Sequence, residues 1–81
     1  MNIQNDLVLY QLDHCPFCAK VRNYLEKKSI SIEMKDIEHD DAAREELIRV
    51  GGKTQVPCLF IDGKPLYESN DIIAWFESHS Q

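Results

Sequence analysis

The sequence contains no long hydrophobic run. None of its segments approaches the roughly 20 consecutive apolar residues that a membrane-spanning helix needs. The start of the chain, Met1–Asp6, has neither the basic residues nor the apolar middle of a signal peptide. We therefore expect a cytoplasmic protein that does not insert into a membrane.

Basic residues are scarce. The chain has 9 Lys and Arg against 14 Asp and Glu, which gives a formal net charge of -5 at pH 7. Binding to nucleic acid requires clustered Lys and Arg that replace the counterions of the phosphate backbone. The charge balance therefore argues against nucleic acid as the main partner.

Cysteine is also scarce, with three residues in a chain of 81. Thiols stay reduced in the cytosol, so an odd number needs no full pairing, and a structural disulfide is disfavoured. Hydrophobic residues make up 43% and charged residues 28% of the chain, as in ordinary globular domains. We see no internal repeat, linker or low-complexity segment, and we expect residues 1–81 to form one small domain that acts as a monomer.

The first part of the chain alternates between strand and helix patterns. Leu7–Tyr10 is a short apolar run that predicts a buried strand. From Pro16 onward the apolar residues follow helical spacing for about three turns, and Arg22 is among the polar residues expected to face outward. Between Ser29 and Asp36 apolar and polar residues alternate, which predicts a strand with one buried face. The apolar residues of that face are Ile30, Ile32 and Met34.

A second helix is predicted after this strand. Asp40 or Asp41 can cap its start, and the glycine pair Gly51-Gly52 marks its end. The side chains expected on its inner face are those of Ala42, Ala43, Leu47 and Ile48.

The last part of the chain predicts a hairpin followed by a helix. Cys58–Ile61 and a short segment around Leu66 are separated by Asp62-Gly63, a strong signal for a two-residue hairpin turn. Ser69 is a suitable N-cap for a final helix whose inner side chains are Ile72, Ile73 and Phe76. The complete order is β-α-β-α-β-β-α, an α/β fold with a four-stranded mixed sheet flanked by helices.

Two of the cysteines, in Cys15-Pro16-Phe17-Cys18, lie where the first strand gives way to the first helix. Proline is favourable at the first helical position, so Cys15 is predicted to occupy the N-cap. Free backbone N–H groups and the helix dipole favour a thiolate there and lower its pKa, which makes Cys15 a nucleophile. Cys18, one turn further along, is expected to stay a thiol until it resolves a disulfide.

Two other interpretations of the cysteine pair remain open. A Cys-x-x-Cys pair can supply half of a tetrahedral zinc site, but a structural zinc needs four ligands, usually from a second pair. This chain has no second pair, and only Cys58 with His14, His39 or His79 could complete the set. We therefore expect no bound metal. The pair could also pack as small hydrophobic residues, although its place between strand and helix is typical of a redox centre.

Three motifs together resemble the glutaredoxin family of the thioredoxin-fold superfamily. Cys15-Pro16-Phe17-Cys18 resembles the Cys-Pro-Tyr-Cys active site, and Thr54-Gln55-Val56-Pro57 resembles the Thr-x-Val-Pro loop. Ser69-Asn70-Asp71 stands where the family holds glutathione. The resemblance runs from about Leu7 to the last helix, and it implies a thioredoxin fold.

The resemblance also implies roles for individual residues. Cys15 and Cys18 are expected to be catalytic, with support from Pro16, Phe17 and Pro57, whose preceding peptide bond is expected to be cis. The residues expected to bind glutathione are Lys53 at its glycyl carboxylate, Val56 along its cysteinyl part, Ser69 and Asn70 at its γ-glutamyl carboxylate, Asp71 near its amino group, and Gln55.

This sequence departs from the family pattern at two places. Leu12 stands where many glutaredoxins carry a lysine before the active site, which is why Lys53 is the expected anchor for the glycyl carboxylate. Tyr67-Glu68 stands where the family often has Gly-Gly. With Ser69 it resembles the Glu-Ser element of glutathione transferase N-terminal domains.

The function that the resemblance implies is a glutathione-dependent thiol–disulfide oxidoreductase. It is expected to reduce protein disulfides and glutathione mixed disulfides through Cys15 as nucleophile and Cys18 as resolving thiol, with glutathione as reductant. Its partners are then disulfide-containing or glutathionylated proteins. Two alternatives are an electron carrier reduced by a flavoprotein reductase, and a module that holds a metal or an iron–sulfur cluster through Cys15. Cys58 is expected to be a buried hydrophobic residue beside the proline.

Overall fold

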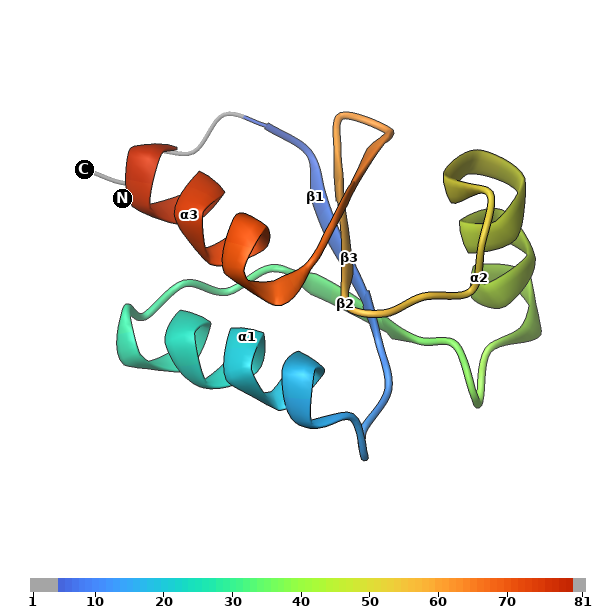
Figure 1. Ribbon diagram of the computed structural model, residues 1–81, viewed down its shortest axis with the longest axis horizontal. Coiled ribbons are helices and arrows are strands. Elements are labelled where there is room, and N and C mark those ends of the chain that lie inside the picture. Colours follow the sequence, from blue (N-terminus) through green and yellow to red (C-terminus); the bar gives the residue numbers. More distant parts are fainter. Residues whose placement is uncertain (1–4, 80–81) are drawn as a thin grey trace.

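The computed structural model describes residues 5–79 and contains a four-stranded sheet in the order β2-β1-β3-β4 (Figure 1). The elements are β1 (Leu7–Gln11), α1 (Pro16–Lys27), β2 (Glu33–Asp36), α2 (Asp41–Glu46), the π-helical turn η1 (Leu47–Gly51), β3 (Cys58–Ile61), β4 (Lys64–Tyr67) and α3 (Ser69–His79). β1 runs parallel to β2 and antiparallel to β3, which is antiparallel to β4. The predicted order and the mixed sheet are confirmed. Residues 1–4 of the stretch in which we expect no signal peptide lie outside the described residues.

Helices cover both faces of the sheet. α1 and α3 lie on one face, and α2 with η1 lies on the other (Figure 1). The core under α1 and α3 consists of Leu9, Val21, Leu25, Leu59, Ile72 and Phe76. The core under α2 consists of Tyr10, Ile37, Ala43, Leu47, Cys58 and Phe60. Successive strand residues point to opposite faces, so β1 and β3 supply both cores. Each fully buried large side chain stabilises the fold by about 1.5–3 kcal/mol.

The hairpin between β3 and β4 has the predicted turn. Asp62 and Gly63 both have positive φ, 52° and 84°, as a type I′ turn requires. The Asp62 carboxylate also accepts the N–H of Asp6 at 2.9 Å, and the Asp62 N–H donates to the Asp6 carbonyl at 2.9 Å. The turn therefore holds the start of β1 as well as its own two strands.

The second strand begins later than the alternation predicted. Only Glu33–Asp36 pairs with β1, and Met34 is 39% exposed instead of buried. The preceding residues complete the end of α1: the N–H of Ile30 donates to the carbonyl of Leu25 at 2.8 Å, while Ser29 adopts a left-handed φ of 58°. This is a Schellman motif, in which backbone N–H groups after the helix bond to its last carbonyls. Those groups are then not available for pairing with a neighbouring strand.

The start of α2 agrees with the prediction, but its inner face does not. Asp40 is the N-cap, and its carboxylate accepts the Ala43 N–H at 3.1 Å. Ala43 and Leu47 are buried, whereas Ala42 is exposed and Ile48 is 42% exposed. Residues four apart share a helix face, while their neighbours are rotated by about 100°. The helix ends in η1 at the predicted glycine pair.

The predicted cap of α3 is wrong by one residue. Ser69 is already helical and 7% exposed, and the carbonyl of Glu68 accepts the first helical N–H, that of Ile72, at 3.0 Å. Glu68 has a φ of 74° because β4 runs up to Tyr67, and the chain must turn into the helix within one residue. A non-glycine residue in this conformation is uncommon and stores backbone strain.

No helix within residues 5–79 is long and apolar enough to cross a membrane. α1 has 12 residues, against the roughly 20 that a bilayer requires.

The Schellman motif gives a prediction about stability. Replacing Ser29 with Gly should raise the free energy of unfolding by about 0.5–1 kcal/mol, because glycine adopts a left-handed φ without the steric cost of a Cβ. In a chain of this size that corresponds to a rise in Tm of about 2–8 °C. Ser31→Gly is the matched control, since Ser31 has no positive φ and should lose stability instead. Equal loss of stability in both variants, measured by urea unfolding, would contradict the motif.

Candidate active site

Cys15 occupies the N-cap of α1. Its backbone is extended, with φ -84° and ψ 120°, and Pro16 follows as the first helical residue. Its Sγ accepts the backbone N–H of Cys18 at 3.4 Å, and its own N–H donates to the carbonyl of Leu12 at 3.3 Å. The N-cap position predicted for Cys15 is confirmed, and its sulfur lies beside the positive end of the helix dipole.

The two thiols of the motif differ strongly in acidity. Burial disfavours the Cys15 thiolate, but hydrogen bonds from the Cys18 thiol and from the N–H groups of Cys18 and Phe17, together with the charge of Arg22, lower its pKa below the ordinary value. Cys18 is fully buried, and burial raises its pKa to about 12. At neutral pH the partly exposed Cys15 is therefore the better nucleophile.

Arg22 supports the nucleophile in a way that the sequence did not reveal. It was expected to face outward, but its guanidinium donates to the carbonyls of Leu12 at 3.1 Å and Asp13 at 3.3 Å, and to the side chain of Gln11. Arg22 therefore fixes the loop between β1 and α1 and places a positive charge near Cys15. Its position two turns after Cys15 on α1 was the available signal, but the helical pattern alone does not show which acceptors lie beside it.

A groove of about 330 Å³ lies next to the cysteine motif. Its lining comes from three distant segments and consists of Phe17, Gln55, Val56, Pro57, Glu68, Ser69 and Asn70. The Val56-Pro57 peptide bond is cis, as the resemblance implied. Phe17 is 63% exposed at the edge of the groove, while Pro57 is buried. Six of the residues proposed from the sequence are thus brought together.

The groove contains one residue that sequence analysis did not assign to the site. The carboxylate of Glu68 accepts a hydrogen bond from the Gln55 amide at 2.9 Å and lines the groove. Nearby, the Lys20 ammonium donates to the side-chain oxygen of Asn70. The similarity of Tyr67-Glu68-Ser69 to a Glu-Ser element was the available signal for Glu68.

Two of the predicted glutathione-binding residues, Lys53 and Asp71, lie outside the lining of the groove. The Lys53 ammonium is 4.5 Å from the centroid of the Tyr67 ring, and the Tyr67 hydroxyl donates to the Lys53 carbonyl at 3.3 Å. Asp71 is exposed in the first turn of α3. Both side chains flank the groove without forming its wall.

The sequence and the fold both match known proteins. A family model described as Glutaredoxin matches residues 7–66. The chain belongs to the glutaredoxin family. It is 33% identical over 66 residues to Glutaredoxin 3 of Escherichia coli, and the match covers 82% of this chain and 80% of that protein.

Solved structures agree with this assignment. A crystal structure of Glutaredoxin 2 from Salmonella typhimurium in complex with glutathione is 36% identical, with a TM-score of 0.76, over 91% of this chain and 34% of that one. A variant of the thioredoxin-like protein BC3987 has a TM-score of 0.78 at 22% identity, over 93% of this chain and 97% of that one. The predicted thioredoxin fold is confirmed, and family membership makes this protein a thiol–disulfide oxidoreductase.

The third thiol of this glutaredoxin belongs to the core. Cys58 follows Pro57 and is fully buried in the cluster under α2, and burial raises its pKa to about 11. The prediction of a buried hydrophobic residue is confirmed. Cys58 therefore does not compete with Cys15 for substrates at neutral pH.

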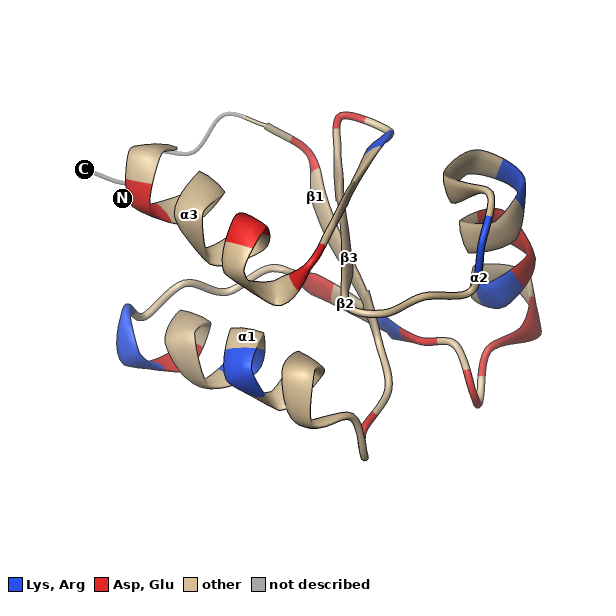
Figure 2. Ribbon diagram, viewed as in Figure 1, with Lys and Arg blue, Asp and Glu red and all other residues tan. Residues whose placement is uncertain are grey.

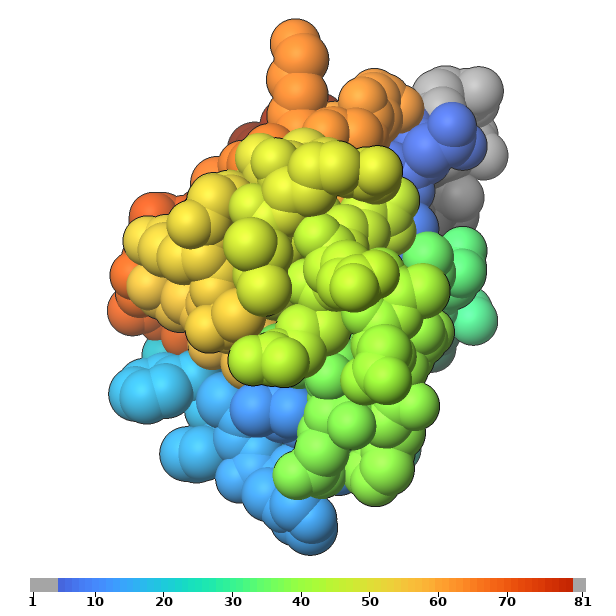
Figure 3. Space-filling model, turned by 90° about the vertical axis from the view of Figure 1, so that its right-hand side faces the viewer, coloured from blue at the N-terminus to red at the C-terminus, as the bar shows by residue number. Residues whose placement is uncertain are grey.

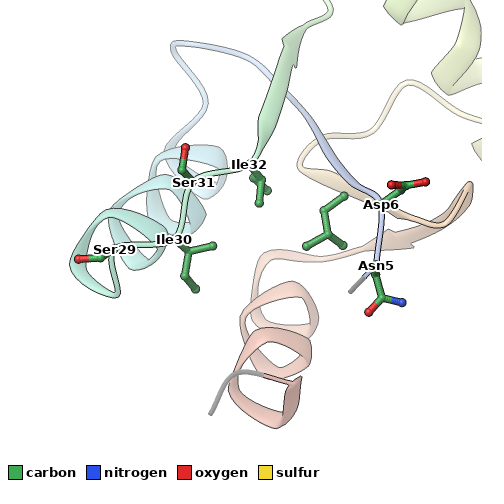
Figure 4. A pocket seen from close by; sticks show the side chains of 7 residues that line it. Asn5, Asp6, Ser29, Ile30, Ser31 and Ile32 are labelled. Carbon is green, nitrogen blue, oxygen red and sulfur yellow. The ribbon is translucent and has the colours of Figure 1, made fainter. Parts of the chain in front are cut away.

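Two further features of the molecule lie apart from the cysteines. Within residues 5–79, the one group of three possible metal ligands is Asp13, Asp36 and His39, with ligand atoms within 4.8 Å of one another, and it contains no thiol. A separate hollow of about 320 Å³ is lined by residues 5–7 and 29–32 (Figure 4). It lies at the C-terminal end of α1, about 18 Å of helix away from Cys15.

The contacts of Arg22 predict the acidity of Cys15. Arg22→Gln should raise the Cys15 pKa, because it removes a nearby positive charge and loosens the loop before the N-cap. The thiolate is negatively charged, so the loss of a nearby positive charge makes it less favourable than the thiol. The thiolate fraction at neutral pH should therefore fall. Lys27→Gln, the same loss of charge at the far end of α1, should leave the pKa unchanged. The measurement is the pH dependence of alkylation by iodoacetamide, and an unchanged profile for Arg22→Gln would overturn this role.

Proposed function

We propose that this protein is a glutathione-dependent thiol–disulfide oxidoreductase that reduces glutathione mixed disulfides and protein disulfides. The observation that carries the proposal is an activated thiol, Cys15, beside a groove built from the cis-proline loop and the start of α3. The glutathione complex of Glutaredoxin 2 from Salmonella typhimurium supports glutathione as the ligand of this groove. We place the reaction in the cytoplasm, where glutathione keeps thiols reduced.

With a glutathione mixed disulfide only Cys15 is needed. The Cys15 thiolate attacks the glutathione sulfur, forms a disulfide with glutathione, and releases the substrate as a thiolate that takes up a proton. The thiolate of a second glutathione then attacks the same sulfur. Oxidised glutathione leaves, and the Cys15 thiolate is regenerated. In the net reaction, one free glutathione and the mixed disulfide become the reduced substrate and oxidised glutathione.

With a protein disulfide Cys18 completes the reaction. Cys15 attacks one sulfur of the substrate and forms a mixed disulfide. The Cys18 thiolate then attacks the Cys15 sulfur, forms the Cys15–Cys18 disulfide and releases the reduced substrate, and two glutathione molecules reduce that disulfide and leave as oxidised glutathione. Besides burial, the neighbouring Cys15 sulfur raises the pKa of Cys18. Because Cys15 carries no negative charge in the mixed disulfide, this repulsion disappears, and Cys18 ionises more readily when its attack is needed.

The groove suits an extended tripeptide. The Val56 backbone beside the cis bond pairs with the cysteinyl part of glutathione, and the free N–H groups of Ser69 and Asn70 bind the γ-glutamyl carboxylate at the start of α3. Lys20, which contacts Asn70, adds a positive charge at that end. We assign the amino group of glutathione to the carboxylates of Glu68 and Asp71. The exposed Lys53 ammonium is the cation assigned to the glycyl carboxylate.

The roles of the two thiols can be separated by substitution. Cys15→Ser should abolish all activity, because no other thiol of the site ionises near neutral pH. Cys18→Ser should keep the turnover of glutathione mixed disulfides and lose the reduction of protein disulfides. The measurement is a coupled assay with glutathione, glutathione reductase and the mixed disulfide of glutathione with 2-mercaptoethanol. Loss of mixed-disulfide turnover in Cys18→Ser would exclude the route through Cys15 alone, and reduction by a flavoprotein reductase but not by glutathione would favour an electron carrier.

The position of Glu68 in the groove predicts the affinity for glutathione. Glu68→Gln should raise the KM for glutathione about tenfold or more, since a charged hydrogen bond is worth about 1.5–3 kcal/mol. Asp71→Asn should have a smaller effect, because Asp71 lies outside the lining of the groove, to which Glu68 belongs. Glu77→Gln, at the other end of α3, is the control and should leave the KM unchanged. A KM for Glu68→Gln equal to that of the unaltered protein would show that the amino group binds elsewhere.

A further inference from the structure

A second hollow borders the active site on the side away from the glutathione groove. It has a volume of about 400 Å³ and is lined by Leu12, Ile37, Glu38, Asp41, Arg44 and Thr54. Leu12 belongs to the loop that carries Cys15 and accepts its N–H. Thr54 directly precedes Gln55, which lines the groove. The cis-proline loop therefore contributes to both concavities, while the loop before Cys15 contributes Leu12 to the hollow and the start of α1 contributes Phe17 to the groove.

Carboxylates outnumber cations in the lining of this hollow, and further acidic residues lie around it. Glu38 and Asp41 belong to its lining, and Asp13, Asp36 and Asp40 lie in the adjoining segments. Figure 2 shows these acidic positions in red along the connection from β2 to α2 and in the loop before α1. In Figure 3 the same segments, green and blue, meet on one face of the molecule. The cations of the same segments are Arg44 in the lining, His39, whose pKa is raised by its hydrogen bond with Asp36, and Arg22, Lys35 and Lys53 nearby.

Local structure explains some of these acids but not all. Asp40 caps α2, and Asp36 accepts the N–H of Glu38 at 2.8 Å as well as bonding to His39. Asp41 lies in the first turn of α2, where a carboxylate stabilises the helix dipole. The fold makes no comparable use of Glu38, whose carboxylate is 3.8 Å from the exposed His39 ring. Its charge is available to a partner.

The hollow combines apolar and acidic walls. Leu12 and Ile37 form apolar parts of its lining, and the carboxylates of Glu38 and Asp41 are exposed. A lysine or arginine side chain has the matching construction, with an apolar stem and a cationic head. A free carboxylate, by contrast, meets a net negative surface there. Charge complementarity therefore favours a cationic side chain as the occupant of the hollow.

We propose that this hollow receives a lysine or arginine of a protein substrate, located close in sequence to the cysteine that Cys15 attacks. The inference rests on the proposed function, because it concerns the protein disulfides reduced at that site. Glutathione occupies the other groove, so the acidic hollow selects among protein substrates without affecting small mixed disulfides. The acidic surface also attracts cationic segments before contact and repels anionic ones, which changes association rates most.

The test measures the reaction of Cys15 with two peptides in the Cys18→Ser protein. Both peptides carry a cysteine as a 2-thiopyridyl disulfide, and they differ only in having two lysines or two glutamates beside it. The Cys15 thiolate attacks the peptide sulfur, and thiopyridone leaves with a proton from solvent, so its absorbance reports the rate. A protein with both Cys15→Ser and Cys18→Ser measures any reaction at Cys58.

The lysine peptide should react about tenfold faster than the glutamate peptide at low salt. The ratio should approach one at about 1 M salt, where charges act over only about 3 Å. Glu38→Gln with Asp41→Asn should lower the ratio severalfold, and Glu38→Lys should lower it further. Glu26→Gln with Glu33→Gln removes the same charge elsewhere and should retain the preference. Comparing two peptides on one variant cancels any change in the Cys15 pKa.

Several results would overturn the inference. They are equal rates for the two peptides, no reaction of Cys15 with either peptide, or a preference that survives in both Glu38 variants. The glutathione assay with the 2-mercaptoethanol mixed disulfide is run in parallel. If that assay shows turnover but the two peptides react equally, only the proposal about the hollow is rejected. If the peptide preference is seen without turnover in that assay, the hollow is supported and glutathione is rejected as the reductant.

Discussion

The position of Cys15 at the N-cap of α1 is the constraint on which the site depends. An N-cap residue has to leave the helix in an extended conformation while its side chain accepts an N–H of the first turn, and here a sulfur does so. That arrangement gives the thiolate its hydrogen bonds and also fixes its direction. It requires the preceding loop to be held in place, which Arg22 does through two backbone carbonyls. The N-cap position of Cys15 therefore both orients its sulfur and lowers its pKa.

The remainder of the fold serves to bring distant segments to this N-cap. β1 and β3 are neighbours in the sheet, so the loop before β3, with its cis proline, lies beside the loop after β1. The hairpin returns the chain through β4, and Glu68 turns it sharply into α3. Each of the three segments contributes little alone. Together they form a groove with an activated sulfur at one side and free helical N–H groups at the other.

In our proposals, two concavities bind different substrates. The groove at the start of α3 is the site proposed for glutathione. The hollow over α2 has an apolar wall and an acidic rim, which favour a cationic side chain of a larger partner. Under these proposals, the same Cys15 thiolate reacts both with glutathione and with protein substrates, because the two bind on different sides of it.

The sequence by itself determined the features that depend on neighbours along the chain. These include the Cys-x-x-Cys pair at a helix start, the Asp62-Gly63 turn and the order of strands and helices, since caps, turns and periodicity are local properties. It could not determine where Arg22 points, which residue caps α3, or where β2 begins to pair. Those outcomes follow from contacts between segments: the loop carbonyls beside α1, the abrupt end of β4, and the Schellman motif that takes up Ser29 and Ile30. The acidic hollow also appeared only in the fold, because its walls come from the loop after β1, from the β2–α2 connection with α2, and from the loop before β3, which meet only when the chain has packed together.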